Sequence, residues 1–315
     1  MNKVQVIVNP FSARGKTVDR WNSIKEVVSH YFKEYKYIFT EKPRQATEIA
    51  REVLKDGFDL IIGVGGDGTL NEITNGFFRD DSHPGTSKAI NEEASLGIVP
   101  SGTGSDFIRF LKIPRDFRKS VPLIKNAAVK KIDVGKARFT QPDGEQVDRY
   151  FVNVADFGLG AEVCKTLFAI PSGKRSAFSY YKGLLSTIRR YSGKDIRITI
   201  DDNEEIEGRF LIGAVANGRI FGGGMIIAPH AEPDDGFFDL VLVKDMTKPE
   251  IIFNSRLLYT GKIDMHPKVT VKHVKKVTVT PVISGQTVGI ETDGELGEAV
   301  PAEFKIIEKS LNFRF

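Results

Sequence analysis

The feature that most limits how this chain can fold is a glycine-rich turn between a predicted buried strand and a predicted helix. Residues 63–76 read GVGGDGTLNEITNG. An apolar run at 60–64 precedes the glycines, and Leu70, Ile73 and Phe77 follow at helical spacing. A strand that passes directly into a helix is the repeating unit of a parallel α/β sheet. We therefore expect the turn to lie at the carboxyl end of a strand in such a sheet.

The sequence around this turn repeats the same strand–helix alternation. Apolar and β-branched runs predict strands at residues 4–8, 37–40, 58–64 and 96–99. An apolar stripe with helical spacing begins at Ala46, and Gly57 follows it where a left-handed C-terminal cap belongs. Residues 1–133 are therefore predicted to form an α/β domain with a parallel sheet.

After Asp133 the pattern changes. Eight short strand-like runs, many separated by glycine and Asp/Asn turns, share the remaining sequence with two helical segments near 178–191 and 249–259. This pattern predicts a mostly antiparallel β-sandwich over residues 134–307. Residues 308–315 are a candidate segment for returning to the first domain.

Composition and charge exclude several classes of protein. Two domains are the expectation for 315 residues. Cys164 is the only cysteine, which excludes an internal disulfide and a thiolate metal cage, and the five histidines lack the spacing of zinc ligands. A net charge of +4 is too small to indicate a nucleic-acid partner. The sequence shows no signal peptide and no apolar run of membrane-spanning length, so we expect a cytoplasmic protein.

The glycine turn has the composition of a phosphate-binding loop. Its unpaired N–H groups and the positive end of the helix dipole suit an anion, and glycine lets the backbone approach closely. A carboxylate at Asp67 would repel phosphates unless Mg²⁺ lies between them. There is no GxxxxGK[ST] motif, and no GxGxxG follows the first strand. The structural alternative is a tight turn in which Asp67 only caps a helix.

A second turn of the same kind weakens that alternative. Residues 100–107 read PSGTGSDF, and they also follow a predicted buried strand. This segment carries two glycines, small hydroxyl side chains and an aspartate. The carboxyl ends of parallel strands meet at one edge of a sheet, so both turns are expected to face the same crevice.

The two turns resemble those of the diacylglycerol kinase catalytic domain, in particular those of soluble bacterial lipid kinases and the related sphingosine kinases. Further similar blocks follow in the family's order: VIVNP, KKIDVG, FVNVADFGLGAEV, VANGRIFGGGMIIAP, DDGFFDLVLV and TDGE. GGDGT alone is shared with NAD kinases, whereas its combination with the later glycine-rich and DGE blocks is specific. The resemblance covers nearly the whole chain.

The resemblance implies an ATP-binding α/β domain, a β-sandwich domain, and phosphorylation of a lipid hydroxyl in a cleft between them. Asp67 and Asp106 would organise a catalytic Mg²⁺. The residues implied to bind ATP and its metal ion are Asn9, Thr40, Gly65, Gly66, Asp67, Gly68, Thr69, Leu70, Asn71, Glu72, Thr103 and Asp106.

Two further sites are implied in the second domain and at its border. Asp293 and Glu295 of TDGE would form an acid–base pair, and which of them takes the hydroxyl proton stays open. A second, structural Mg²⁺ is implied at DDG, held by the Asp235 side chain and the backbone carbonyls of Glu232 and Phe237. As bare sequence, TDGE is equally well explained as a turn, and a plain turn is the better explanation of DDG.

The chain departs from the family pattern at three places. Ala13 replaces the glycine of NPxSG, and Ser105 stands where GTxND would supply asparagine. Residues 79–94 form a long polar insert, which we interpret as a solvated excursion in preference to a lid.

The substrate and its location are less sharply defined by the sequence. Diacylglycerol is the favoured substrate, with a sphingoid base or phosphatidylglycerol as alternative substrates. The alternative functions are that of an NAD kinase and that of a regulator that binds ATP without turnover.

Residues 163–194 carry seven basic and no acidic side chains among aromatic residues. This segment is a candidate for peripheral contact with an anionic membrane, and an ordinary solvated helix face explains it equally well. A homodimer is possible.

Overall fold

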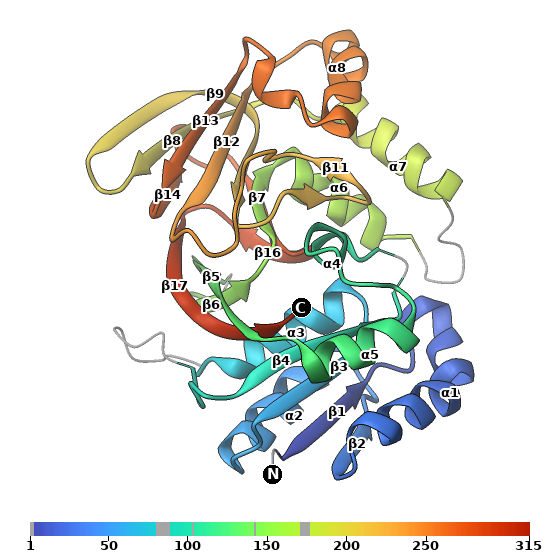
Figure 1. The fold of residues 1–315 in the computed structure, drawn as a ribbon. Helices are drawn as coiled ribbons and strands as arrows, with labels where there is room; N and C mark the ends of the chain where they lie inside the picture. The colour runs from blue at the N-terminus through green and yellow to red at the C-terminus, as the bar shows by residue number, and fades with distance from the viewer. Residues whose placement is uncertain (1–2, 80–88, 103, 142, 171–176) are drawn as a thin grey trace. The chain divides into compact units, whose positions relative to one another are not determined.

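The chain folds into two units, each with its own hydrophobic core (Figure 1). The structure is a computed structural model that describes residues 3–79, 89–102, 104–141, 143–170 and 177–315, with backbone alone for 177–181. Unit 1 comprises the residues up to Val134 together with Pro233–Gly236 and Ile307–Phe315. Unit 2 comprises Gly135–Glu232 and Phe237–Ile306. Most of the polar insert, residues 80–88, lies outside the described residues.

Unit 1 contains the predicted parallel sheet. Its strands run in the order β17, β4, β3, β1, β2, and every pairing between neighbours is parallel. The bounds are β1 (Val4–Val8), β2 (Tyr35–Phe39), β3 (Leu60–Gly65), β4 (Ser95–Pro100) and β17 (Ala302–Arg314). All residues of β1, β3 and β4 are buried, as continuous apolar runs in a sheet with two covered faces should be.

Helices cover both faces of this sheet. One face packs against α1 (Lys16–Tyr31) and α5 (Phe117–Asn126) through Trp21, Ile24 and Ile124. The other face is covered by α3 (Asp67–Phe77), whose Ile73 fills the space beside Gly63, and by α2 (Gln45–Lys55), which packs on α3. Gly57 follows α2 with a left-handed φ of 73°, as predicted. The short helices η1 (Ser12–Gly15) and α4 (Asp106–Phe110) follow β1 and β4.

Close packing between α2 and α3 fixes the helix that begins at the glycine turn. A Cβ atom on Gly76 would lie 2.5 Å from Ala50 Cβ and 2.7 Å from Thr47 O. The Thr47 hydroxyl also donates to Glu72 O at 2.7 Å. Glycine is therefore required near the end of α3 for α2 to come this close.

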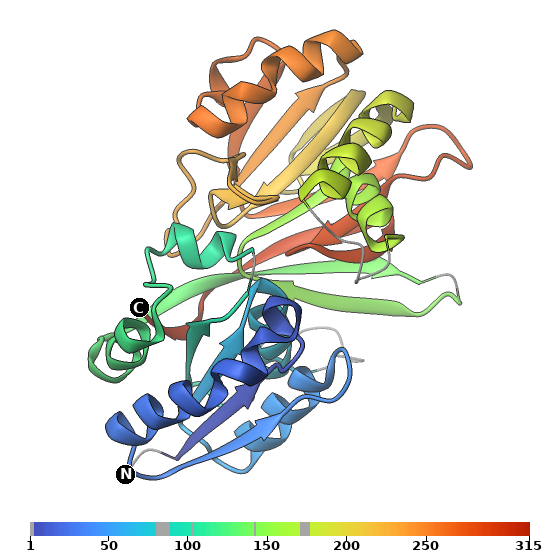
Figure 2. The same cartoon turned by 90° about the vertical axis from the view of Figure 1, so that its right-hand side faces the viewer.

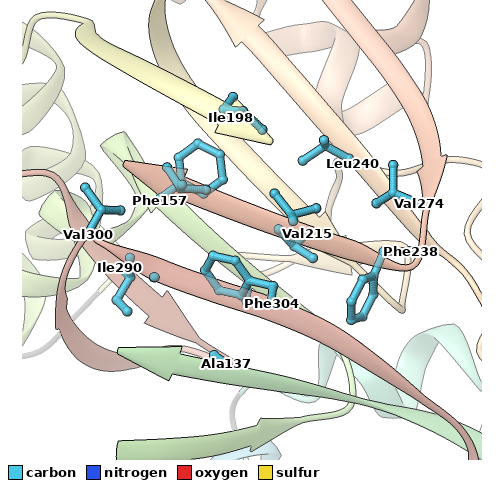
Figure 3. Close-up of a cluster of buried hydrophobic side chains, with 14 of the residues drawn as sticks. Ala137, Phe157, Ile198, Val215, Phe238, Leu240, Val274, Ile290, Val300 and Phe304 are labelled. Atoms are coloured by element: carbon cyan, nitrogen blue, oxygen red, sulfur yellow. The ribbon is translucent and has the colours of Figure 1, made fainter. Parts of the chain in front are cut away.

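Unit 2 is the predicted antiparallel sandwich. The main path of strands is β16, β15, β7, β9, β8, β14, β17; β12 joins β9 to β13, and β5 pairs with β6. The bounds are β5 (Val129–Thr140), β6 (Gln146–Phe151), β7 (Val154–Gly158), β8 (Lys194–Ile200), β9 (Glu204–Ala216), β12 (Phe238–Lys244), β13 (Val269–Val274), β14 (Lys276–Pro281), β15 (Gly289–Thr292) and β16 (Glu295–Ala299). Figure 3 shows the core between these strands, where Phe157, Phe238 and Phe304 are fully buried.

A second core in unit 2 lies beneath three helices. These are α6 (Leu159–Phe168), α7 (Ala177–Arg190) and α8 (Lys248–Thr260), and η3 (Ile263–Met265) follows α8. The two helices predicted from the sequence, α7 and α8, are confirmed, whereas α6 was not predicted. The GGG segment forms the bend between β10 (Ile220–Phe221) and β11 (Met225–Ile226), with positive φ at Gly222, Gly223 and Gly224.

The last strand, β17, pairs with strands of both units. Its first part pairs antiparallel with β14 in unit 2, from Ala302 to Lys305. Its last part pairs parallel with β4 in unit 1, at Asn312 and Phe313. One continuous strand therefore pairs with β4 in unit 1 and with β14 in unit 2.

We predict that Gly76→Ala lowers the free energy of unfolding by about 1–3 kcal/mol, because the new methyl group must push α2 from α3. Gly68→Ala in the same helix is the matched control. No heavy atom lies within 4 Å of a Cβ there, so we expect a gain of up to about 1 kcal/mol. Urea unfolding of both variants tests this, and equal midpoints would contradict it.

Candidate functional site

The two glycine–aspartate turns of unit 1 lie side by side, as predicted. A Cβ atom on Gly102 would lie 2.5 Å from Gly66 Cα, so the two backbones touch where neither has a side chain. Ser101 N donates to Gly65 O at 2.7 Å. The carboxyl ends of β3 and β4 thus form one continuous backbone surface.

Asp67 joins the two turns. It is the first residue of α3, and its Oδ2 accepts hydrogen bonds from Ser105 N at 2.6 Å and Asp106 N at 2.8 Å. Those N–H groups belong to the start of α4, so Asp67 caps the helix of the other turn instead of its own. Hydrogen bonds from backbone N–H groups to a carboxylate are short and strong. This contact holds the second turn against the first.

The other oxygen of Asp67 is left without a partner. Asp67 Oδ1 is buried with no hydrogen-bond partner in the described part of the chain, and the same holds for Ser105 Oγ. Burial raises the pKa of Asp67, and the neighbouring charge of Asp106 adds to this rise. Asp106 in turn contacts Arg109 Nη1 at 3.3 Å. An unpartnered carboxylate oxygen beside a second acid fits a divalent cation, which prefers hard oxygen ligands.

Other residues predicted to bind ATP fall into two groups. Asn9 and Thr40 follow β1 and β2 at the same edge of the sheet, and Asn9 Nδ2 donates to Thr69 Oγ1 at 3.0 Å. Leu70 and Asn71 instead have buried side chains, and Glu72 Oε2 accepts from Ala46 N at 3.1 Å. The side chain of Leu70 therefore packs inside unit 1, and that of Glu72 contacts the start of α2. Thr103 lies outside the described residues.

Backbone strain occurs at both positions where the chain departs from the family pattern in these loops. Ala13 has φ 53° in place of the family's glycine, and Ser105 has φ 81° in place of its asparagine. Arg14 and Gly15 continue the left-handed backbone with φ 59° and 85°. Glycine and asparagine adopt this conformation more easily than alanine or serine. Both loops therefore keep the left-handed backbone conformation although Ala13 and Ser105 adopt it less easily than glycine or asparagine.

The TDGE segment of unit 2 forms a two-residue hairpin turn. Asp293 and Gly294 have φ 51° and 85°, which is the geometry of the Asp-Gly turn that joins twisted strands, here β15 and β16. The Asp293 carboxylate accepts three backbone hydrogen bonds, from Val152 N at 2.9 Å, Asn153 N at 3.0 Å and Val154 N at 3.1 Å. Asp293 therefore holds the β6–β7 junction against this hairpin.

Glu295 has different surroundings. It is the first residue of β16 and is half-buried. Its carboxylate has no hydrogen-bond or ion-pair partner among the residues that the structure describes. The two acids of the motif are thus separated by the turn, and one is engaged by backbone amides while the other is not.

Two further carboxyl groups face each other behind this turn. Asp156 and Glu291 are direct partners across β7 and β15, and both are buried. Asp156 Oδ1 accepts from Ala161 N at 3.0 Å, and Glu291 Oε2 accepts from Gly294 N at 2.5 Å. Burial raises the pKa of Asp156 to about 6; burial and the Asp156 charge hold the pKa of Glu291 well above its usual range. Such a pair is expected to retain a shared proton.

The sequence analysis missed this pair and also Asp133. Asp133 is fully buried in unit 1, and its two oxygens accept from Lys309 N at 2.6 Å and Gly236 N at 2.7 Å. Burial raises its pKa, and the charges of Asp235 and Asp234 in the DDG turn add to this. An acid inside a predicted strand-like run was the available signal for Asp156 and Glu291, whereas Asp133 lay at the predicted domain boundary, outside every predicted strand.

The ligands implied at the DDG turn, Asp235, Glu232 and Phe237, lie within six residues of one another in the sequence. Asp235 is exposed beside Gly236, whose φ is 81°. The Glu232 carboxylate pairs with Arg219, so only the Glu232 carbonyl resembles a metal ligand, as the sequence analysis proposed. Phe237 is partly exposed. Across the ranges that the structure describes, no three or more His, Cys, Asp and Glu side chains gather as a metal cluster.

Comparison with known proteins identifies the family. Residues 3–137 match the model of the diacylglycerol kinase catalytic domain, and residues 153–314 match that of the YegS C-terminal NAD kinase beta sandwich-like domain. This chain belongs to the diacylglycerol kinase family. It is 31% identical to a diacylglycerol kinase of Staphylococcus saprophyticus, over 84% of this chain and 79% of the relative. A diacylglycerol kinase of Staphylococcus aureus is 29% identical over 87% of this chain and 79% of its own length.

Solved structures agree with the diacylglycerol kinase assignment. A putative diacylglycerol kinase from Bacillus anthracis superposes with a TM-score of 0.77 and 26% identity, over 100% of this chain and 95% of its own. Yeast NADH kinase complexed with NADH superposes with a TM-score of 0.53 at 12% identity, over 99% of this chain and 82% of its own. At that identity the second comparison shows a shared fold alone.

We predict that Asp156→Asn makes the protein more stable at neutral pH and above. The Asp156 carboxyl has a pKa of about 6 in the folded protein and 3.8 as an unperturbed side chain. The folded state therefore loses stability as the pH rises from 3.8 to about 6 and this carboxyl ionises. The amide keeps the Ala161 contact and carries no charge. Urea unfolding across this pH range should show a gain above pH 6 that disappears in acid, with exposed Asp143→Asn as a flat control. A gain independent of pH would contradict the raised pKa.

Proposed function

We propose that this chain is an ATP-dependent lipid kinase that phosphorylates diacylglycerol to phosphatidic acid. The observation that carries the proposal is the pair of glycine turns tied by Asp67. They present backbone N–H groups, the N-terminus of α3 and an unpartnered carboxylate oxygen at one edge of a parallel sheet. Phosphates bind at such helix N-termini, and the acid accounts for the metal ion that accompanies a nucleoside triphosphate.

The proposed triphosphate site uses the backbone of Gly65, Gly66, Gly68 and Thr69. Asn9 positions Thr69, and Thr40 and Thr103 complete the proposed set. Asp67 and Asp106 would hold Mg²⁺, which when bound neutralises the charge that develops on the transferred phosphoryl group. The unpartnered Asp67 Oδ1 supports this assignment.

Asp293 and Glu295 are the proposed acid–base pair for the lipid hydroxyl. A general base must reach the proton that it removes, and Glu295 has a carboxylate without partners in the described residues. Asp293 orients the backbone at 152–154 through its three hydrogen bonds. In phosphoryl transfer, positioning and neutralisation of charge contribute more than the base itself.

A second, structural Mg²⁺ is proposed at the DDG turn. The Asp235 side chain and the carbonyls of Glu232 and Phe237 are the proposed ligands. The excess negative charge of Asp133, Asp234 and Asp235 supports a cation there. Glu232 and Phe237 would contribute main-chain oxygens, which Mg²⁺ accepts alongside carboxylates and water.

A lipid substrate requires the enzyme to reach a bilayer, so we propose a peripheral location at the inner face of the cytoplasmic membrane. No helix within the described ranges is both long and apolar enough to cross a bilayer. Lys165, Lys182, Arg189 and Arg190 of the basic segment are exposed on α6 and α7. Lys174 and Arg175 lie outside the described residues.

We predict that Asp67→Asn lowers kcat by about a hundredfold or more, because the metal-ligand charge is removed. The asparagine oxygen can still accept from Ser105 N and Asp106 N, so the fold should persist. The measurement is transfer of labelled phosphate from ATP to diacylglycerol in detergent micelles, with exposed Asp19→Asn as the control. Undiminished turnover in the variant would show that Asp67 is not a ligand of the catalytic metal ion.

The acid pair is tested by comparing Asp293→Asn with Glu295→Gln. We expect Glu295→Gln to lose kcat with unchanged stability. Asp293→Asn should lose activity and also about 1–3 kcal/mol of unfolding free energy, because an amide NH₂ opposes a backbone N–H. Measurements of kcat and urea unfolding separate the two, and exposed Glu298→Gln is the control. Full activity of Glu295→Gln would leave Asp293 as the sole candidate.

A further inference from the structure

Helix α8 is apolar on two sides. Its inner side contributes Ile251 to the second core of unit 2, and Leu258 packs against that core. Its outer side exposes Ile252 (55%), Phe253 (64%) and Tyr259 (61%). A surface helix usually has a polar outer side. The inner contacts explain the fold of α8, and the outer residues need another explanation.

The exposed residues form one face. Ile252, Phe253, Arg256 and Tyr259 recur at i, i+1, i+4 and i+7, which places them on one side of the helix. Met265 of η3, which packs next to α8, is 74% exposed. We call these five residues the α8 face. Isolated exposed apolar residues are common, but a contiguous group marks a contact surface.

The charges around the α8 face indicate an anionic partner. The cations near it outnumber the acids, because Glu250 pairs with Lys268 at 3.0 Å and only Asp264, which lies 3.2 Å from the His230 ring, is left against Arg256 and Lys262. Arg256 and Lys262 have no carboxylate partner among the described residues, and Arg256 lies over the Phe253 ring at 4.2 Å. The uncompensated charge next to the apolar side chains is therefore positive.

The neighbouring helix adds more charge of the same sign. α7 contacts α8, and Figures 1 and 2 both show the two helices at the same end of unit 2. Lys182, Arg189 and Arg190 of α7 are exposed, and α7 contains no acidic residue. A shallow surface hollow of about 580 Å³ is lined by these three cations with Leu185 and Ser186. Each cation near an anionic bilayer adds roughly a fivefold preference for it.

We propose that the α8 face is the surface by which this enzyme docks on an anionic lipid bilayer. The apolar side chains would enter the boundary between headgroups and acyl chains, as those of interfacial helices do, and Arg256 and Lys262 would contact lipid phosphates. The proposal rests on the proposed function, because a lipid kinase must reach a substrate that stays in the membrane. It adds an apolar anchor that is separate from the basic segment.

The test is sedimentation with phosphatidylcholine vesicles prepared with and without phosphatidylglycerol. Ile252→Ser/Phe253→Ser should weaken binding to the anionic vesicles by about tenfold or more, since two side chains lose their burial. The matched control is Val282→Ser/Ile283→Ser, an adjacent pair that is 40% and 52% exposed elsewhere in unit 2. Arg256→Gln/Lys262→Gln should reduce the preference for phosphatidylglycerol, with exposed Lys244→Gln/Lys305→Gln as its control.

Two readouts distinguish failure of this proposal from failure of the proposed function. Phosphorylation of diacylglycerol in detergent micelles should be unchanged in all four variants, because no bilayer is needed there. Vesicle binding alone decides the role of the α8 face, and micelle turnover of the unmodified protein decides the enzymatic function. Unchanged vesicle binding by Ile252→Ser/Phe253→Ser would overturn the proposal. A fall in molar mass of that variant from dimer to monomer, with vesicle binding retained, would overturn it in favour of self-association.

Discussion

The site in unit 1 depends on one interaction, the hydrogen bonds from the start of α4 to the Asp67 carboxylate. They bring together two turns, since the bonded residues are 38 and 39 positions apart in the sequence. The glycines at 66 and 102 allow the approach, and the carboxylate fixes it. The same carboxylate keeps one oxygen unpartnered within the described chain, so a structural contact and a chemically available atom coexist in one side chain. Burial raises the pKa of Asp67, and the two hydrogen bonds from Ser105 and Asp106 offset only part of this rise.

Buried and partly buried carboxylates elsewhere in the protein are compensated in two ways. Asp293 and Asp133 accept backbone N–H groups and thereby fasten distant segments, at 152–154 and at 236 and 309. Asp156 and Glu291 instead rely on each other, which is favourable only while a proton is shared. Hydrogen bonds from backbone N–H groups favour an ionised carboxylate, but burial still raises the pKa of Asp133, as it does for Asp156 and Glu291. The DGE turn is held by two carboxylates, because Asp293 accepts from Val152 N and Glu291 accepts from Gly294 N.

The sequence was sufficient for features that depend on local patterns. Continuous apolar runs identified β1, β3 and β4, and glycine next to aspartate identified both turns. α6 was missed because Gly158, which ends β7, and Gly160, the second residue of α6, together resemble a turn. Gly160 is needed because a side chain there would collide with Asp156. The roles of Asp133 and Asp293 arise from partners more than a hundred residues away, which no local pattern contains. The burial of Leu70 and the contact of Glu72 with α2 likewise follow from tertiary packing.

The pairing of β17 with strands of both units has a consequence for biosynthesis. β4 of unit 1 receives its neighbour at Asn312 and Phe313, which leave the ribosome long after the rest of that sheet. During synthesis, the edge of β4 in unit 1 therefore stays unpaired while the strands of unit 2 are translated. An open edge of this kind is prone to mispairing with other chains. Formation of the complete unit 1 sheet is therefore coupled to the synthesis of unit 2.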